Sequence, residues 1–153
     1  MTIRPHTPGS GESPAEEICR GVARLLRAHA IAGIAEVALA NGRRADFLGV
    51  SATGSIWIVE VKSCLGDFRS DRKWPTYRDF CDQLFFAVAV GFPCEVLPAD
   101  TGLIIADRYG GEIVRLAPER RLPPTRRRMI TLELARTAAL RLLAVSEPPG
   151  GGP

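Results

Sequence analysis

The sequence predicts a single α/β domain in which a mixed central sheet is flanked by helices. Two observations lead to this prediction. Helical and strand-like stretches alternate along the chain, and 46% of the 153 residues are apolar, which is enough for one sizeable core. Charged residues make up 24% of the chain, an ordinary balance for a folded protein. We expect the domain to span residues 12–146, with flexible tails at 1–11 and 147–153.

The N-terminal half should contain a helix followed by an antiparallel meander. Ser13-Pro14 with Glu16 is a typical helix start, and apolar residues then recur at helical spacing to about Ala30. Asn41-Gly42 and the turn-forming stretch 51–55 separate the strand-like segments that follow. These signals predict three strands, over residues 34–39, 44–50 and 56–62.

The C-terminal half should add a helix, a strand, a hairpin and a closing helix. A polar, charged stretch comes first, and Pro75 then favours a helix over residues 76–83, because proline suits the first turn. The apolar run 84–90 predicts a buried strand, and Gly110-Gly111 predicts a hairpin between 103–106 and 112–116. The closing helix is expected over residues 127–145, with one apolar face made of Leu132, Ala135, Ala139 and Leu142.

The turn at 51–55 sets the register of the second and third strands. If the hairpin is centred near Thr53, Asp46 faces Glu60 across the strands, and side-chain alternation places Lys62 on the face of Glu60. Two opposed carboxylates destabilise a strand pair unless a cation joins them. Asp46, Glu60 and Lys62 are therefore candidate catalytic residues for metal-dependent phosphodiester hydrolysis.

A simpler alternative is that these charges only form a solvated face, as is common on antiparallel sheets. Against it, the strand 56–62 is apolar on both faces until Glu60 and Lys62 are reached. That pattern is expected for a central strand with a functional site at its end.

Arg44-Ala45-Asp46 followed by Glu60-Val61-Lys62, between two expected helices, resembles the PD-(D/E)XK nuclease superfamily. Ala45 stands where that pattern usually has proline. The resemblance covers roughly residues 16–90 and implies a restriction-endonuclease-like core. It further implies that Asp46, Glu60 and the Val61 carbonyl hold Mg²⁺ or Mn²⁺, while Lys62 positions the attacking water at a DNA phosphodiester. A glutamate often completes the metal shell in that superfamily, and the alternatives here are Glu16 or Glu17, with Glu36 as a competitor.

A longer resemblance covers nearly the whole chain. Residues 42–46 (GRRAD), 56–63 (IWIVEVKS), 67–69 (DFR), 71–75 (DRKWP) and 77–82 (YRDFCD) are similar to the MmcB-related DNA repair family. That family is placed with PD-(D/E)XK proteins and is linked to the bacterial DNA-damage response. The resemblance implies DNA repair without showing strand cleavage. Two alternatives stay open. One is a non-catalytic DNA-binding or scaffold module that retains the nuclease fold. The other is a hydrolase of small phosphorylated molecules, which is disfavoured because this sequence has no Gly-rich phosphate-binding loop.

Basic and aromatic residues are interleaved after the third strand, where they could hold phosphates and stack on unpaired bases. The alternative is a salt-bridged loop capped by a core tryptophan. The candidate DNA contacts are Arg43, Arg44, Arg69, Arg72, Lys73, Trp74 and Tyr77, with Ser63, Asp67 and Gln83 in support. We expect Asp79, Asp82 and Gln83 on the second helix, and for these three residues we favour a role in holding the fold over a role at the active site. A denser basic run, Arg120, Arg121, Arg126, Arg127 and Arg128, could track a DNA backbone or form a solvated surface.

Charge and composition restrict the partners only weakly. The net charge of +3 suits a polyanion such as DNA without selecting it, and the four cysteines and two histidines are too scattered for a zinc site. No apolar run approaches the roughly 18 residues that a membrane-spanning helix needs, and no signal segment is recognisable. We therefore expect a cytoplasmic protein that binds DNA and does not bind membranes. Other repair proteins are optional partners, and a homodimer is one option for its oligomeric state.

Overall fold

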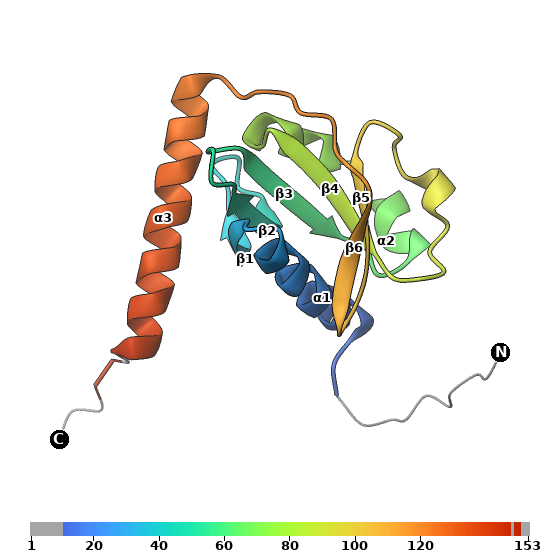
Figure 1. The fold of residues 1–153 in the computed structure, drawn as a ribbon, viewed down its shortest axis with the longest axis horizontal. Coiled ribbons are helices and arrows are strands. Elements are labelled where there is room, and N and C mark those ends of the chain that lie inside the picture. The colour runs from blue at the N-terminus through green and yellow to red at the C-terminus, as the bar shows by residue number, and fades with distance from the viewer. Residues whose placement is uncertain (1–10, 148, 151–153) are drawn as a thin grey trace.

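The protein is described by a computed structural model that covers residues 11–147, 149 and 150 (Figure 1). Most of both expected tails, residues 1–10, 148 and 151–153, therefore lie outside the described residues. The elements are α1 (Pro14–Ala28), β1 (Ala32–Ala38), β2 (Arg44–Val50), β3 (Ile56–Val61), α2 (Leu65–Ser70), the 3₁₀ helix η1 (Trp74–Phe80), β4 (Gln83–Val88), the 3₁₀ helix η2 (Cys94–Val96), β5 (Gly102–Asp107), β6 (Gly110–Arg115) and α3 (Pro124–Ser146).

One six-stranded sheet, in the order β1-β2-β3-β4-β5-β6, forms the centre of the molecule. β1, β2 and β3 form the expected antiparallel meander, β4 runs parallel to both β3 and β5, and β6 returns antiparallel at the far edge. The prediction of a mixed sheet flanked by helices is thus confirmed. Within the described residues, no helix is both long and apolar enough to cross a membrane.

Helix α1 covers one face of the sheet (Figure 1). A capping box between Ser13 and Glu16 begins the helix, as the sequence predicts, and its buried side chains pack against Phe47, Val59 and Phe85. At Gly21 the helix passes so close to the β5–β6 hairpin that an added Cβ would lie 2.1 Å from the Asp107 carbonyl oxygen. Glycine is required there by the close approach of two backbones.

The opposite face of the sheet is covered by η1, α2 and the start of α3. Tyr77, Ile130 and Leu134 pack against the β2, β3 and β4 side chains that point to this side. β4 is buried along its whole length, as expected for a parallel strand with elements on both faces. Both faces of the central strands are therefore in contact with helices, and their polar residues are confined to the strand ends.

The segment between β3 and β4 differs from the prediction. Residues 65–70 form the short helix α2, whereas the sequence suggested only a polar stretch, and the expected helix 76–83 is a 3₁₀ helix that ends at Phe80. Gln83 begins β4 and Asp82 precedes it, so neither lies on a helix. The extended backbone at Cys81 ends η1, because the carboxylate and both backbone groups of Asp82 are committed to partners elsewhere.

The apolar face expected on the closing helix also lies differently. Ile130 and Leu134 are the buried residues of α3, whereas Leu132 and Leu142 are 59% and 70% exposed. The face that periodicity identified therefore points away from the domain. Tertiary packing selected a stripe on the other side of the same helix, because both sides carry apolar residues and the sheet can cover only one.

The buried carboxylate of Asp82 joins three segments that are distant in sequence. It accepts hydrogen bonds from the Ile56 N–H (2.7 Å) and the Leu122 N–H (2.8 Å), and it forms an ion pair with Arg127 at the start of α3. Burial alone would raise the pKa of Asp82, but the hydrogen bonds from Arg127, Ile56 and Leu122 lower it below its ordinary value. These contacts agree with the expectation that Asp82 holds the fold together.

Replacing Asp82 with Asn should lower the free energy of unfolding at pH 7 by about 2–4 kcal/mol, because Arg127 loses its buried partner. The pKa of Asp82 is lowered on folding, so its contribution is present above the ordinary value of 3.8 and is lost as pH falls through the folded value. Asp82→Asn should therefore lose less stability on acidification than the unchanged protein.

Urea unfolding at pH 7 and at about pH 3 measures both effects. Asp79→Asn is the matched control, because Asp79 lies three residues away and is exposed, so that its change should stay within about 0.5 kcal/mol. Equal losses in the two variants would contradict this role of Asp82.

Candidate active site

The β2–β3 pair has the register that the turn predicts. Phe47 pairs with Val59, and Val50 pairs with Ile56. The next position along this register places Asp46 opposite Glu60, at the end of the strands remote from the turn. The two carboxylates therefore meet where the regular backbone ladder stops.

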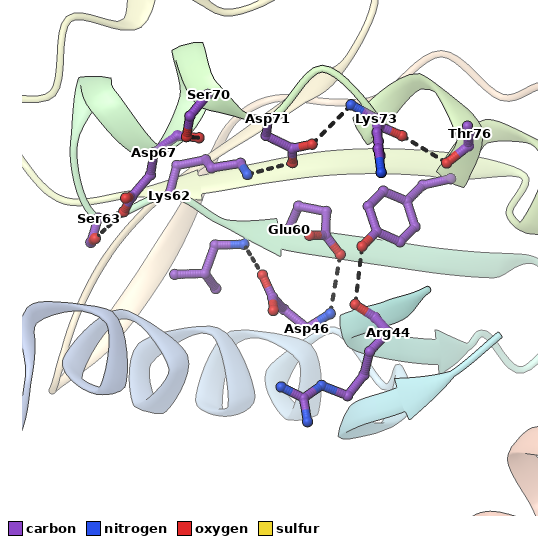
Figure 2. Close-up of polar contacts among 12 residues, drawn as sticks. Arg44, Asp46, Glu60, Lys62, Ser63, Asp67, Ser70, Asp71, Lys73 and Thr76 are labelled. Atoms are coloured by element: carbon purple, nitrogen blue, oxygen red, sulfur yellow. Dashed lines mark hydrogen bonds and ion pairs between the residues drawn. The ribbon is translucent and has the colours of Figure 1, made fainter. Parts of the chain in front are cut away.

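Beyond Phe47 and Val59, carboxylates replace backbone carbonyls as the hydrogen-bond acceptors between the strands (Figure 2). The Asp46 N–H donates to Oε1 of Glu60 over 3.1 Å, and the Val61 N–H donates to Oδ2 of Asp46 over 2.8 Å. Each acidic side chain thus bonds the opposite strand. This exchange fixes both carboxylates in the opening between β2 and β3.

The carboxylate pair carries negative charge that its surroundings do not fully offset. Glu60 is 3% exposed, and burial together with repulsion from Asp46 raises its pKa to about 8. Burial also raises the pKa of Asp46, although the hydrogen bond from Val61 and the charge of Lys62 oppose the change. Each carboxylate therefore disfavours ionisation of the other, and a cation would relieve their repulsion.

Lys62 lies on the expected face, and its ammonium group is held by a partner that the sequence did not identify. Its Nζ donates to Oδ2 of Asp71 over 2.6 Å (Figure 2). The Lys62 side chain is 9% exposed. Asp71 also accepts the Lys73 N–H over 3.0 Å. Burial alone would raise the pKa of Asp71, but the hydrogen bonds from Lys62 and Lys73 lower it. The loop after α2 therefore positions the ammonium beside the carboxylate pair.

The glutamates considered as further metal ligands do not join Asp46 and Glu60. Register places Glu36 of β1 opposite Asp46, but Glu36 has a φ of +53° and pairs instead with Arg44 at 3.8 Å. Glu16 is used by the capping box, and Glu17 is half-buried on α1. Between residues 11 and 150, as far as they are described, no three His, Cys, Asp or Glu side chains are grouped to hold a metal ion.

Oxygen donors of the right chemistry for a hard divalent ion are nevertheless present. Asp46 and Glu60 supply two carboxylates, and the Val61 N–H points toward Asp46. Because the N–H and C=O of one residue in an extended strand project to the same side, the Val61 carbonyl is directed toward Asp46 as well. Two carboxylates and a carbonyl fit Mg²⁺ or Mn²⁺ when water completes the shell.

The aromatic candidates for DNA contact are packed into the domain. Tyr77 is 7% exposed, and its hydroxyl donates to the Arg44 carbonyl over 3.0 Å. Trp74 is half-buried against Phe86, with the Arg78 guanidinium 5.2 Å from its ring centre. This placement favours the alternative of a loop closed by a core tryptophan, and base stacking by these two residues stays a prediction.

The remaining candidates occupy several surroundings. Arg44, Arg69, Arg72 and Lys73 are exposed, and Arg43 is half-buried in the turn after β1. Ser63 donates to Asp67 at the start of α2, which lowers the pKa of Asp67, and the buried Gln83 amide donates to the Ala117 carbonyl. Gln83 therefore holds the segment after β6. Its predicted position on a helix was wrong, since Gln83 begins β4, and its supporting role at the site stays a prediction.

The arginine run 120–128 is partly used within the domain. Arg127 pairs with Asp82, Arg120 pairs with Asp100, and Arg126 donates to the Asp79 carbonyl. Arg121 and Arg128 are exposed. Sequence reasoning could not separate these roles, because the acidic partners come from distant parts of the chain.

Two residues near the carboxylate pair were not recognised from the sequence. Asp71 was seen only as part of a charged stretch, and Cys19 gave no signal at all. Burial and the nearby charges of Asp46, Glu36 and Glu16 raise the pKa of Cys19 to about 11. Cys19 on α1 therefore lies close enough to Asp46 to feel its charge.

The carboxylate pair should make stability depend on pH. Folding raises the pKa of Glu60 from 4.5 to about 8, so the stabilisation present below pH 4.5 is lost as pH rises toward about 8. Glu60→Gln should remove most of this loss and be more stable than the unchanged protein near pH 8. Thermal unfolding from about pH 5 to pH 9 measures it, with the exposed Glu112→Gln as control. Parallel profiles for the Glu60 variant and the unchanged protein would contradict the raised pKa.

Comparison with known proteins identifies the family of the chain. The model of the family described as DNA repair protein MmcB-like matches residues 4–149. The SPO1766 protein of unknown function from Silicibacter pomeroyi has a similar structure, with a TM-score of 0.88 and 45% sequence identity over 94% of this chain and 98% of that one. No curated protein matches the sequence. The chain belongs to the MmcB-like DNA repair protein family.

Proposed function

We propose that this chain is a metal-dependent DNA endonuclease of the PD-(D/E)XK type that acts in DNA repair. The observation that carries the proposal is the pair of carboxylates, Asp46 and Glu60, fixed between β2 and β3 next to Lys62. Burial of two like charges is unfavourable in an ordinary surface sheet and is typical of a site that awaits a cation.

The family supports DNA as the substrate, and the surface chemistry is compatible with it. Arg44, Arg69, Arg72 and Lys73 are exposed on the elements adjoining the carboxylate pair. Guanidinium and ammonium groups in such positions can contact phosphates on either side of a scissile bond. A role on DNA would place the protein in the cytoplasm, where bacterial DNA lies.

Each residue of the pair and its neighbours would have a distinct role. Asp46, Glu60 and the Val61 carbonyl would hold Mg²⁺ or Mn²⁺, which when bound supplies Lewis-acid stabilisation of the phosphodiester. Lys62 would orient the attacking water and offset charge on the phosphate in the transition state. In hydrolysis the water oxygen bonds to phosphorus, one P–O ester bond breaks, and the leaving oxygen gains a proton.

A non-catalytic DNA-binding or scaffold module is the second candidate. Two observations favour it. The Lys62 ammonium pairs with Asp71, and the two carboxylates gather no third acidic ligand from the described residues. A domain that keeps the fold but binds DNA without cleaving it would look the same in these contacts. The two candidates differ in whether bound DNA is cut.

Cleavage of labelled duplex, single-stranded and branched DNA with Mg²⁺ or Mn²⁺ tests the proposal. Glu60→Gln and Lys62→Met should each lower the cleavage rate by about 100-fold or more, because each removes a group that stabilises the transition state. Glu112→Gln, on the exposed side of β6, should cleave normally. Salt-dependent DNA binding with no cleavage by the unchanged protein would select the non-catalytic module.

Asp71 is expected to act as a positioning residue through Lys62. Asp71→Asn should lower the cleavage rate by about 10-fold, because the ammonium loses its charged partner, with little change in DNA affinity. Asp71→Glu should recover part of the loss. Single-turnover rates and binding measured on the same DNA separate the two effects, and equal rates for Asp71→Asn and the unchanged protein would contradict the role.

A further inference from the structure

Helix α3 contacts the rest of the domain through one side, where Arg126 and Arg127 near its start are followed by three further contact residues. Ile130 and Leu134 are buried, and the Arg141 guanidinium donates to the carbonyls of Ala35 and Glu36 on β1. These three residues follow one another at helical spacing, so they define the inner face of α3. Figure 1 shows the helix standing beside the sheet, with its C-terminal half extending away from η1.

A second apolar stripe runs along the opposite side of α3. It consists of Leu132, Ala135, Ala139 and Leu142, all exposed, and we call it the outer stripe. Its spacing of three, four and three residues is that of a coiled-coil seam. Leu143 lies beside it and is 55% exposed. Leu140 lies about 100° round the helix from Ala139, away from the stripe, and Met129 lines a hollow with Ala38 and Leu39. Within the described residues, nothing covers this stripe.

We propose that the outer stripe pairs with the outer stripe of a second copy of this chain, with the two α3 helices antiparallel. The stripe reads Leu-Ala-Ala-Leu from either end, with the same spacing in both directions. A two-fold interface needs this property, because residue i must meet residue j while residue j meets residue i. Leu132 then lies opposite Leu142 of the second copy, and Ala135 lies opposite Ala139 of the second copy.

The sizes of the side chains also suit this arrangement. The two alanines at the centre allow the helix axes to approach closely, toward the lower end of the usual range of about 8–10 Å. The leucines at the two ends fill the space where the helices diverge. Each half of the interface thus contains one pair of alanines and one pair of leucines, and the two surfaces fit each other without rearrangement of the domain.

The exposed leucines would form the apolar centre of a modest dimer interface. Leu132, Leu142 and Leu143 are 59%, 70% and 55% exposed. Complete burial of a fully exposed side chain of this size removes roughly 60–120 Å² from water, so burial of these three partly exposed leucines removes roughly 100–200 Å² per copy. A standard interface buries about 800 Å² per partner, so the alanines and the flanking polar residues must supply the rest.

Charge distinguishes a second copy from a polyanionic partner. Arg128 and Arg136 are the charged residues nearest the outer stripe, and the stripe itself is uncharged. Two copies would therefore repel weakly, and salt would screen that repulsion. Association through the stripe should hold or strengthen from about 0.05 to about 0.5 M NaCl, whereas binding of DNA to the same arginines should weaken.

Sedimentation equilibrium of the full chain over a range of concentrations tests the proposal. The unchanged protein should dimerise, and Leu132→Glu with Leu142→Glu should raise the dimer dissociation constant at least about 100-fold, because four carboxylates would be buried in one interface. Leu116→Glu is the matched control, since Leu116 is 63% exposed and lies outside α3. Circular dichroism and thermal unfolding verify that each variant is folded, and Ala139→Arg gives a second disruption of the same stripe.

A cysteine pair tests the antiparallel direction. Ala135→Cys and Ala139→Cys should form a mixed disulfide when the two variants are combined, and each alone should form few homodimeric disulfides beyond those of the unchanged protein. A monomer at all concentrations, a dimer that survives the glutamate substitutions, or efficient disulfides within a single variant would overturn the proposal. None of these readouts depends on DNA cleavage, so they stand apart from the proposed function.

Discussion

The arrangement of the domain depends on the hydrogen bonds and the ion pair of the buried Asp82 carboxylate. It precedes β4 directly, receives the first N–H of β3, and holds both Leu122 and Arg127 at the entry to α3. Its backbone also bonds Ile56 and Arg120. One side chain thereby sets the relative positions of the central strands and the closing helix, which are far apart in the sequence.

The two ends of β3 use carboxylates in opposite ways. At the start of the strand, Arg127 offsets the charge of Asp82 and the pKa of this group is lowered. At the end, Asp46 and Glu60 oppose each other and both pKa values are raised. Such uncompensated charge costs stability, and its persistence in a well-packed sheet is the reason to assign the second end a function.

Local signals predicted much of this domain, and long-range contacts decided the rest. The capping box at Ser13, the turn at 51–55 and the alternation in β3 are properties of short segments, so the register of Asp46 and Glu60 could be worked out from the sequence. The partner of Lys62 could not, because Asp71 reaches it through the path of a loop. The inner face of α3 was also missed, since periodicity finds an apolar stripe without saying what covers it.

Arg141 protects the exposed edge of the sheet against aggregation with other chains. β1 is an edge strand, and an uncovered edge invites the strand of another chain to extend the sheet. Successive carbonyls of a regular strand point in opposite directions, but the positive φ of Glu36 allows those of Ala35 and Glu36 to reach one guanidinium. Glu36 and Arg141 together therefore prevent a strand of another chain from pairing with β1 and starting an aggregate. The outer stripe of α3 stays free for association with a second copy.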